Sequence, residues 1–178
     1  MSSLKWLVIN YNLPTEPSRH RVAAWRGLKK IGAVNIQQSM WILPEDEENL
    51  SALQKISGDI EANGGEAFLM ESVFFDARDE ERVMALFNSM RDDEYMEFIG
   101  ECKKYLKELE KEIKIEKFTF AELEEEEAEL EKLISWHSKL GKRDIFNASR
   151  GNEARELADM IRAAFEHYSE MVNQREVK

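Results

Sequence analysis

The first 76 residues of the chain alternate between short apolar runs and amphipathic segments. Residues 5–11 form an apolar run without helical spacing, and turn residues follow it, which predicts a first strand. Between Pro17 and Ile31 apolar residues recur at every third position and Gly32 follows as a stop, so we expect the first helix here. The apolar positions are Val22, Trp25, Leu28 and Ile31. Residues 34–43 are rich in β-formers and predict one bent strand or two short strands.

A second helix and a final strand complete this half. Residues 45–63 open with acidic side chains, which favour a helix N-terminus, and close on Gly64-Gly65. Residues 67–75 then predict a short, largely buried strand. The order β-α-β(β)-α-β favours a sheet with both helices packed on one face, as in ferredoxin-like folds. Trp25 and Trp41 are predicted to be core residues, because the helix and the sheet must face each other there.

Only helical periodicity remains beyond residue 77. A heptad seam defines the first long helix, and its members are Tyr95, Ile99, Cys102, Leu106, Leu109 and Ile113. The segment Thr119-Phe120-Ala121-Glu122 is a capping box that begins a second helix, which we expect to end at Gly141. A loop over residues 142–148 follows, and Ser149 is a candidate cap for a third helix. Three helices with short connections predict an antiparallel bundle.

The pattern therefore predicts an α+β fold class with two domains. Residues 1–76 form a ferredoxin-like α/β unit, and residues 77–178 form an acidic helical bundle. Apolar residues make up 43% of the 178 positions, so a packed core can form. No apolar run approaches the ~20 residues that a membrane span needs. The apolar run at the start of the chain is too short for a signal peptide. We therefore expect a cytoplasmic protein without membrane contact.

Charge is distributed unevenly along the chain. The net charge is −11, yet residues 1–43 hold six basic residues against Glu16 alone, a sum of +5, so the remainder carries −16. An acidic body repels nucleic acid, so we expect any DNA contact to use the first helix only. Arg19, Arg26 and Lys30 fall within about 40° of one line on that helix. This basic face is our candidate contact for a phosphate, an oxyanion or an acidic partner, and the alternative is a solvated face.

Motifs for catalysis and for metal binding are missing from the sequence. It contains no G-x-S-x-G, no G-x-G-x-x-G and no P-loop. Cys102 is the only cysteine, which excludes multi-cysteine metal sites and predicts a buried thiol. A di-iron bundle requires a His three residues after a Glu, and neither His137 nor His167 has such a Glu. The acidic run 122–129 is interpreted as a solvated helix face. We predict no catalytic residue, no metal site and no cofactor.

Several stretches resemble the N-terminal domain of ChrB, the chromate-resistance regulator found beside chromate efflux pumps in bacteria. They are residues 17–22, 25–26, 28–33, 37–44, 117–125 and 143–146. The resemblance implies a regulatory role in chromate or general oxyanion stress. The first half is also distantly similar to the ferredoxin-like modules of PaaX-type repressors and of the CRISPR nuclease Cas2. Where that nuclease type has a metal-binding Asp after its first strand, this chain has Asn10-Tyr11-Asn12, so we expect no metal-dependent cleavage.

These observations predict a non-enzymatic regulatory or partner-binding protein of the ChrB type, linked to chromate or oxyanion resistance. Its expected partner is another protein or a second copy of the chain, and an oxyanion ligand is an alternative. A further alternative is a transcription regulator that contacts DNA through Arg19, Arg26 and Lys30. The last alternative is a chromate reductase-like enzyme, although the sequence has no flavin or nicotinamide motif.

Overall fold

The computed structural model describes residues 4–176 of the chain. The chain divides into two compact units, residues 1–86 and 87–178, and the helix α3 begins in the first and continues in the second. The predicted α+β class is confirmed. The elements are β1 (Trp6–Asn12), α1 (Arg19–Lys30), β2 (Val34–Gln37), β3 (Met40–Pro44), α2 (Glu47–Ala62), β4 (Glu66–Ser72), α3 (Ala77–Lys114), α4 (Phe120–Arg143) and α5 (Gly151–Glu176).

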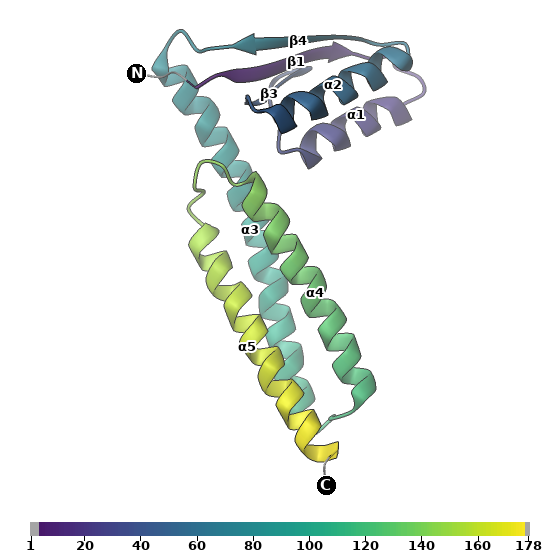
Figure 1. Cartoon of the computed structure of the whole chain (residues 1–178), viewed down its shortest axis with the longest axis vertical. Coiled ribbons are helices and arrows are strands. Elements are labelled where there is room, and N and C mark those ends of the chain that lie inside the picture. The colour runs from purple at the N-terminus through teal and green to yellow at the C-terminus, as the bar shows by residue number, and fades with distance from the viewer. Residues whose placement is uncertain (1–3, 177–178) are drawn as a thin grey trace. The chain divides into compact units, whose positions relative to one another are not determined.

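The first unit contains a four-stranded antiparallel sheet with the strand order β2-β3-β1-β4. Helices α1 and α2 contact each other and lie side by side on one face of this sheet (Figure 1). This order and this helix placement are the ferredoxin-like arrangement that the sequence predicts. The run 34–43 forms two short strands, because Gln38 adopts a positive φ of 42° in the turn between them.

The sheet core is built mainly by β1, in which the four residues from Trp6 to Ile9 are all buried. Leu28 of α1 and Leu53 and Ile60 of α2 are fully buried side chains of the two helices. Gly64 ends α2 with a φ of 83°, which favours glycine. Gly65 then passes close to the backbone carbonyl of Asn12, where a side chain would not fit.

The prediction that Trp25 is a core residue is wrong, whereas Trp41 is buried as expected. Trp25 is 48% exposed and Trp41 only 4% exposed. Residues spaced by three drift by about 60° per step on a helix of 100° per residue, so the four apolar positions cannot all face one side. Helix α1 turns Ala24 and Leu28 inward, and this orientation leaves Trp25 on the exposed side.

The prediction that the last strand is largely buried is also wrong. Strand β4 ends at Ser72, and Phe68 and Met70 are 60% and 44% exposed. In this edge strand Phe68 and Met70 alternate with the less exposed Ala67 and Leu69, so the two exposed side chains lie together on the more open face of the sheet. An apolar run by itself does not reveal whether both faces of a strand are covered.

The second unit is an antiparallel bundle in which α3, α4 and α5 run side by side and reverse direction at each connection (Figure 1). The predicted seam of α3 is confirmed, because its members belong to one buried cluster with residues of α4 and α5 or pack against that cluster. Tyr105 of α3 donates a hydrogen bond to the carbonyl of Glu126, at 3.0 Å. Within residues 4–176 no helix is long and apolar enough to cross a membrane.

The helix ends of the bundle partly follow the sequence signals. Thr119 caps α4 as predicted, since its hydroxyl accepts a hydrogen bond from the Glu122 N–H. Helix α4 continues through Gly141 to Arg143, so the predicted end at Gly141 is two residues too early. The Ser149 hydroxyl donates a hydrogen bond to the Asp92 carboxylate. Asp92 also accepts a hydrogen bond from the backbone N–H of Arg150. A carboxylate of α3 therefore caps the start of α5, where the sequence predicted a cap by Ser149.

Candidate functional site

The candidate site lies on α1, whose first residue follows Ser18 and whose last residue, Lys30, comes shortly before Gly32. The Ser18 carbonyl accepts from the Val22 N–H at 3.1 Å and begins the helical hydrogen bonds. Gly32, with a φ of 86°, follows the last turn, and its N–H donates to the carbonyl of Lys29. Basic residues in the last turn suit the negative end of the helix dipole.

Five basic side chains of α1 are exposed to solvent. They are Arg19, Arg21, Arg26, Lys29 and Lys30. The three predicted site residues, Arg19, Arg26 and Lys30, therefore all lie on the accessible part of the helix. Among the ion pairs of residues 4–176, none involves any of these five cations.

Two apolar residues join the cations on the exposed side, although the sequence pattern had placed both on the apolar stripe of the helix. Val22 is 42% exposed and Trp25 is 48% exposed. The Lys29 Nζ atom lies 5.1 Å from the centroid of the Trp25 ring, a cation–π distance. The 60° drift of the period-three pattern was the signal that could have revealed them. We name these seven residues, the five cations with Val22 and Trp25, the α1 surface.

The chemistry of the α1 surface is that of anion recognition. A guanidinium group binds a carboxylate or a phosphate through two parallel N–H bonds, and an ammonium group binds them as a point charge. An exposed indole adds a flat apolar contact beside the charges. The surface holds no nucleophile or general base, so it is suited to binding.

Residues 4–176 contain histidine, cysteine and carboxylate side chains, which are the side chains that most often bind metal. Within the described part of the chain, no three residues among His, Cys, Asp and Glu are arranged to hold a metal ion. His137 stacks on Phe98 with 5.2 Å between the ring centroids, and burial lowers the pKa of this histidine, with a further contribution from nearby arginines. His167 is exposed. Cys102 is buried, as predicted, and burial raises the pKa of its thiol to about 12.

A partly buried ion-pair cluster connects α3 and α4 near the end of α4. The guanidinium of Arg91, which is 2% exposed, lies 3.5 Å from the carboxylate of Glu94. Arg143 binds the other oxygen of the same carboxylate at 2.9 Å. Burial lowers the pKa of Arg91, and the charge of Glu94 opposes this shift. Glu94 is therefore the shared counter-ion of two arginines on two helices.

An acidic cluster lies toward the other end of the bundle. Glu126 of α4 is 5% exposed, and burial together with neighbouring carboxylates raises its pKa to about 7. Glu112 of α3 is also buried, and the ammonium of Lys117 lies 3.6 Å from one of its oxygens. Lys117 binds Glu122 more closely, at 2.7 Å. Lys111 also lies 3.9 Å from Glu112, but no lysine pairs with Glu126 among the described residues, so burial and the neighbouring carboxylates raise its pKa.

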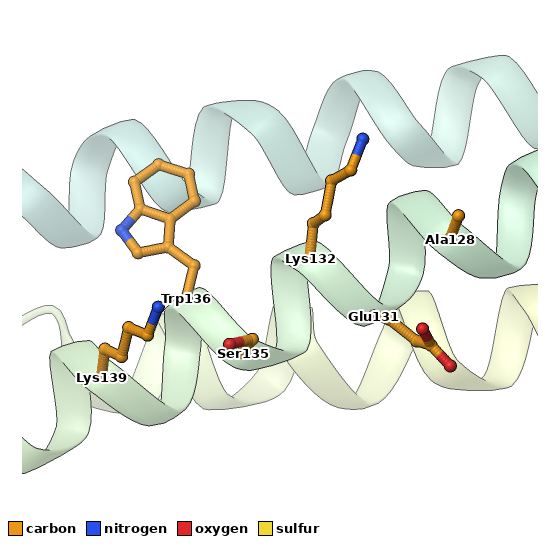
Figure 2. A pocket seen from close by; sticks show the side chains of 6 residues that line it. All are labelled: Ala128, Glu131, Lys132, Ser135, Trp136 and Lys139. Atoms are coloured by element: carbon orange, nitrogen blue, oxygen red, sulfur yellow. The ribbon is translucent and has the colours of Figure 1, made fainter.

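A shallow hollow lies on the surface of α4. Figure 2 shows its lining, which comes from one helix and consists of Ala128, Glu131, Lys132, Ser135, Trp136 and Lys139. Trp136 packs edge-on against Phe98, with 5.5 Å between ring centroids, so part of its ring is used in the bundle. Lys132 is held by Glu129 at 3.1 Å. The hollow is open and offers no set of converging polar groups.

Taken together, the structure defines a class of α+β protein with a ferredoxin-like unit, a basic first helix and an acidic three-helix bundle. The family model described as "Protein ChrB, N-terminal" matches residues 21–178. The chain belongs to this family, which confirms the resemblance found in the sequence.

One curated relative supports the assignment over a shorter stretch. A protein named "Protein ChrB" from Cupriavidus metallidurans is 30% identical to this chain over 96 residues. The match covers 54% of this chain and 29% of that protein. The aligned part is thus less than a third of the relative's length. No solved structure matches the chain.

Proposed function

We propose that this protein is a non-enzymatic, cytoplasmic regulator linked to chromate resistance, and that it binds an anionic partner through the α1 surface. Membership of the ChrB N-terminal family supports the link to chromate resistance. The observation that carries the binding role is the set of five exposed cations on α1 without an ion pair in the described chain.

The absence of ion pairs is informative because acidic groups are abundant in this chain. The sequence holds 36 acidic residues against 25 basic ones, and many bundle cations pair with a neighbouring carboxylate. Helix α1 has no acidic residue at all. Its cations are therefore available to an external anion without first breaking an internal ion pair.

Duplex DNA is the anion that the geometry of the α1 surface favours. The cations are spread along 12 residues, or about 18 Å of helix, and they are solvent-exposed. A single small oxyanion needs donors that converge on one point, whereas an extended polyanion uses a row of separate charges. The exposed Trp25 adds an apolar contact within the row.

The test is a titration of a triple variant, Arg19→Gln, Arg26→Gln and Lys30→Gln, with duplex DNA at several salt concentrations. For a DNA contact, the slope of log affinity against log salt should fall by roughly one unit per lost phosphate contact. A matched control removes three exposed bundle cations by Lys103→Gln, Lys107→Gln and Lys139→Gln. The control lowers the net charge equally but should leave the slope near that of the parent.

The outcomes separate the candidate partners. If the parent does not bind duplex DNA but binds an acidic protein or chromate, and the triple variant loses this binding, the α1 surface stands and DNA is excluded. If the triple variant and the control bind every ligand as the parent does, the α1 surface is not the contact. Circular dichroism of each variant checks that the fold is unchanged.

A further inference from the structure

Strand β4 carries an exposed apolar strip at the edge of the sheet. The strand pairs with β1 only, and Phe68 and Met70 are 60% and 44% exposed. Side chains two residues apart in a strand point to the same face, so these two residues form one continuous strip. The outer backbone groups of β4 have no neighbouring strand in the described chain.

The two edges of the sheet differ in how they are protected. The edge strand β2 has four residues, and its pairing with β3 is interrupted by an irregularity between Asn35 and Gln37. Short length and bulges are common ways to prevent edge-to-edge association. Strand β4 has seven residues in unbroken register with β1, and it contains no proline and no lysine. It therefore offers a regular edge to another strand.

We propose that β4 pairs antiparallel with β4 of a second copy of this chain, with the two-fold axis at Leu69. The residues of β4 read Glu-Ala-Phe-Leu-Met-Glu-Ser. In this register Phe68 lies opposite Met70 of the other copy, twice by symmetry, and a methionine sulfur makes favourable contacts with an aromatic ring. Glu66 lies opposite Ser72, and Ala67 lies opposite Glu71. No two like charges face each other across the interface.

Other registers fit less well. A shift of two residues in one direction places Glu66 opposite Met70, and a shift in the other direction places Ser72 opposite Phe68. Each shift places a polar side chain opposite a residue of the apolar strip. It also places one apolar residue, Phe68 or Met70, opposite the same residue of the other copy. In a register shifted by one residue, residues opposite each other would point to different faces of the sheet, so the apolar side chains would not meet. The charge and apolar pattern of β4 thus matches its own copy in one register.

The dimer would join two four-stranded sheets into one sheet of eight strands and carry two α1 surfaces. Two linked contacts bind a repeated or extended partner more tightly than one, because the second contact forms within the same complex. The dimer does not depend on the identity of the anionic partner. Its test is therefore separate from the titration that tests the α1 surface.

The register is tested with single cysteines and a short thiol-reactive crosslinker. Cys102 is the only cysteine of the chain and is buried, so an introduced cysteine is the accessible thiol. In the proposed register Glu66→Cys faces Ser72→Cys of the other copy, whereas each variant alone places its two thiols far apart. An equimolar mixture should give several-fold more crosslinked dimer than either variant alone. Equal yields in all three samples would overturn the register.

The interface itself is tested by sedimentation of the full chain. The parent should be dimeric at tens of micromolar, and Phe68→Glu together with Met70→Glu should be monomeric, because four carboxylates would meet at the interface. Met96→Glu and Met160→Glu, at residues 50% and 52% exposed on the bundle, are controls that should remain dimeric. A monomeric parent, or a β4 variant as dimeric as the controls, would overturn the proposal.

Discussion

Basic residues of α1 and basic residues of the bundle have different surroundings. In the bundle, Lys117 and Arg143 pair with carboxylates on neighbouring turns and neighbouring helices, and Arg91 is buried against Glu94. The five cations of α1 make no such pair in residues 4–176. These bundle cations are therefore partly neutralised within the fold, whereas the α1 cations keep an uncompensated charge at the surface.

Tryptophan residues also differ in exposure between α1 and the rest of the fold. Trp136 of the bundle packs on Phe98, and Trp41 is buried in the sheet, but Trp25 is half exposed beneath Lys29. An exposed tryptophan between free cations contributes little to the core and is well placed for a partner. Stability and binding should therefore respond to different substitutions in the two regions.

Among the charged groups, the largest loss of stability is expected for Glu94→Gln, which removes the shared counter-ion of Arg91 and Arg143. Leaving a buried guanidinium without its carboxylate should lower the free energy of unfolding by about 3 kcal/mol. The control Glu101→Gln breaks the exposed pair with Lys104 on the same helix and should cost less than about 1 kcal/mol. Chemical denaturation measures both, and equal midpoints for the two variants would contradict a structural role for the buried pair.

An effect of opposite sign, which depends on pH, is expected for Glu126→Gln. The folded-state pKa of Glu126 is raised from 4.5 to about 7, so its stabilising protonated form is fully present below pH 4.5 and is lost as the pH rises through 7. The glutamine variant does not ionise. At pH 8 it should be more stable than the parent by up to about 3 kcal/mol, and near pH 4.5 the two should be equal.

The control for this pH dependence is Glu127→Gln, since the neighbouring Glu127 side chain is exposed. It should leave the stability difference from the parent near zero at every pH. Denaturation of all three proteins between pH 4.5 and 8 provides the measurement. A constant difference between Glu126→Gln and the parent across this range would show that Glu126 does not titrate near neutral pH.

The smallest effect on stability is expected for Trp25→Ala. Because this ring is 48% exposed, its removal should cost about 1 kcal/mol, whereas Trp41→Ala, at a residue 4% exposed, should cost about 3 to 5 kcal/mol. Binding of the anionic partner should show the reverse order when Trp41→Ala is assayed under conditions in which it is folded. A cost for Trp25→Ala as large as that for Trp41→Ala would place Trp25 in the core.

Much of the fold could be predicted because its signals are local. Apolar periodicity identified the strands and helices of both halves, and the capping box at Thr119 located the start of α4 to the residue. The heptad seam of α3 identified a buried face before any partner helix was known. Each of these signals depends on neighbouring residues in the chain, where bond geometry limits the choices.

The candidate site was predicted only in part. Arg19, Arg26 and Lys30 were selected as one basic face, but Trp25 was assigned to the core. A helix of 12 residues with small residues at Ala24 and Gly27 can turn more than one side toward a sheet. The pattern limits the orientation of such a helix but does not determine it.

The sequence by itself determined the order and type of the elements, the basic character of α1 and the family of the chain. The tertiary structure decided that β4 lies at an edge with Phe68 exposed, that α1 turns Trp25 outward, and that Asp92 of α3 accepts a hydrogen bond from the Arg150 N–H just before α5. The physical reason is that burial and remote hydrogen bonds depend on which surfaces meet in space. That choice is made by the packing of distant segments, which no local pattern records.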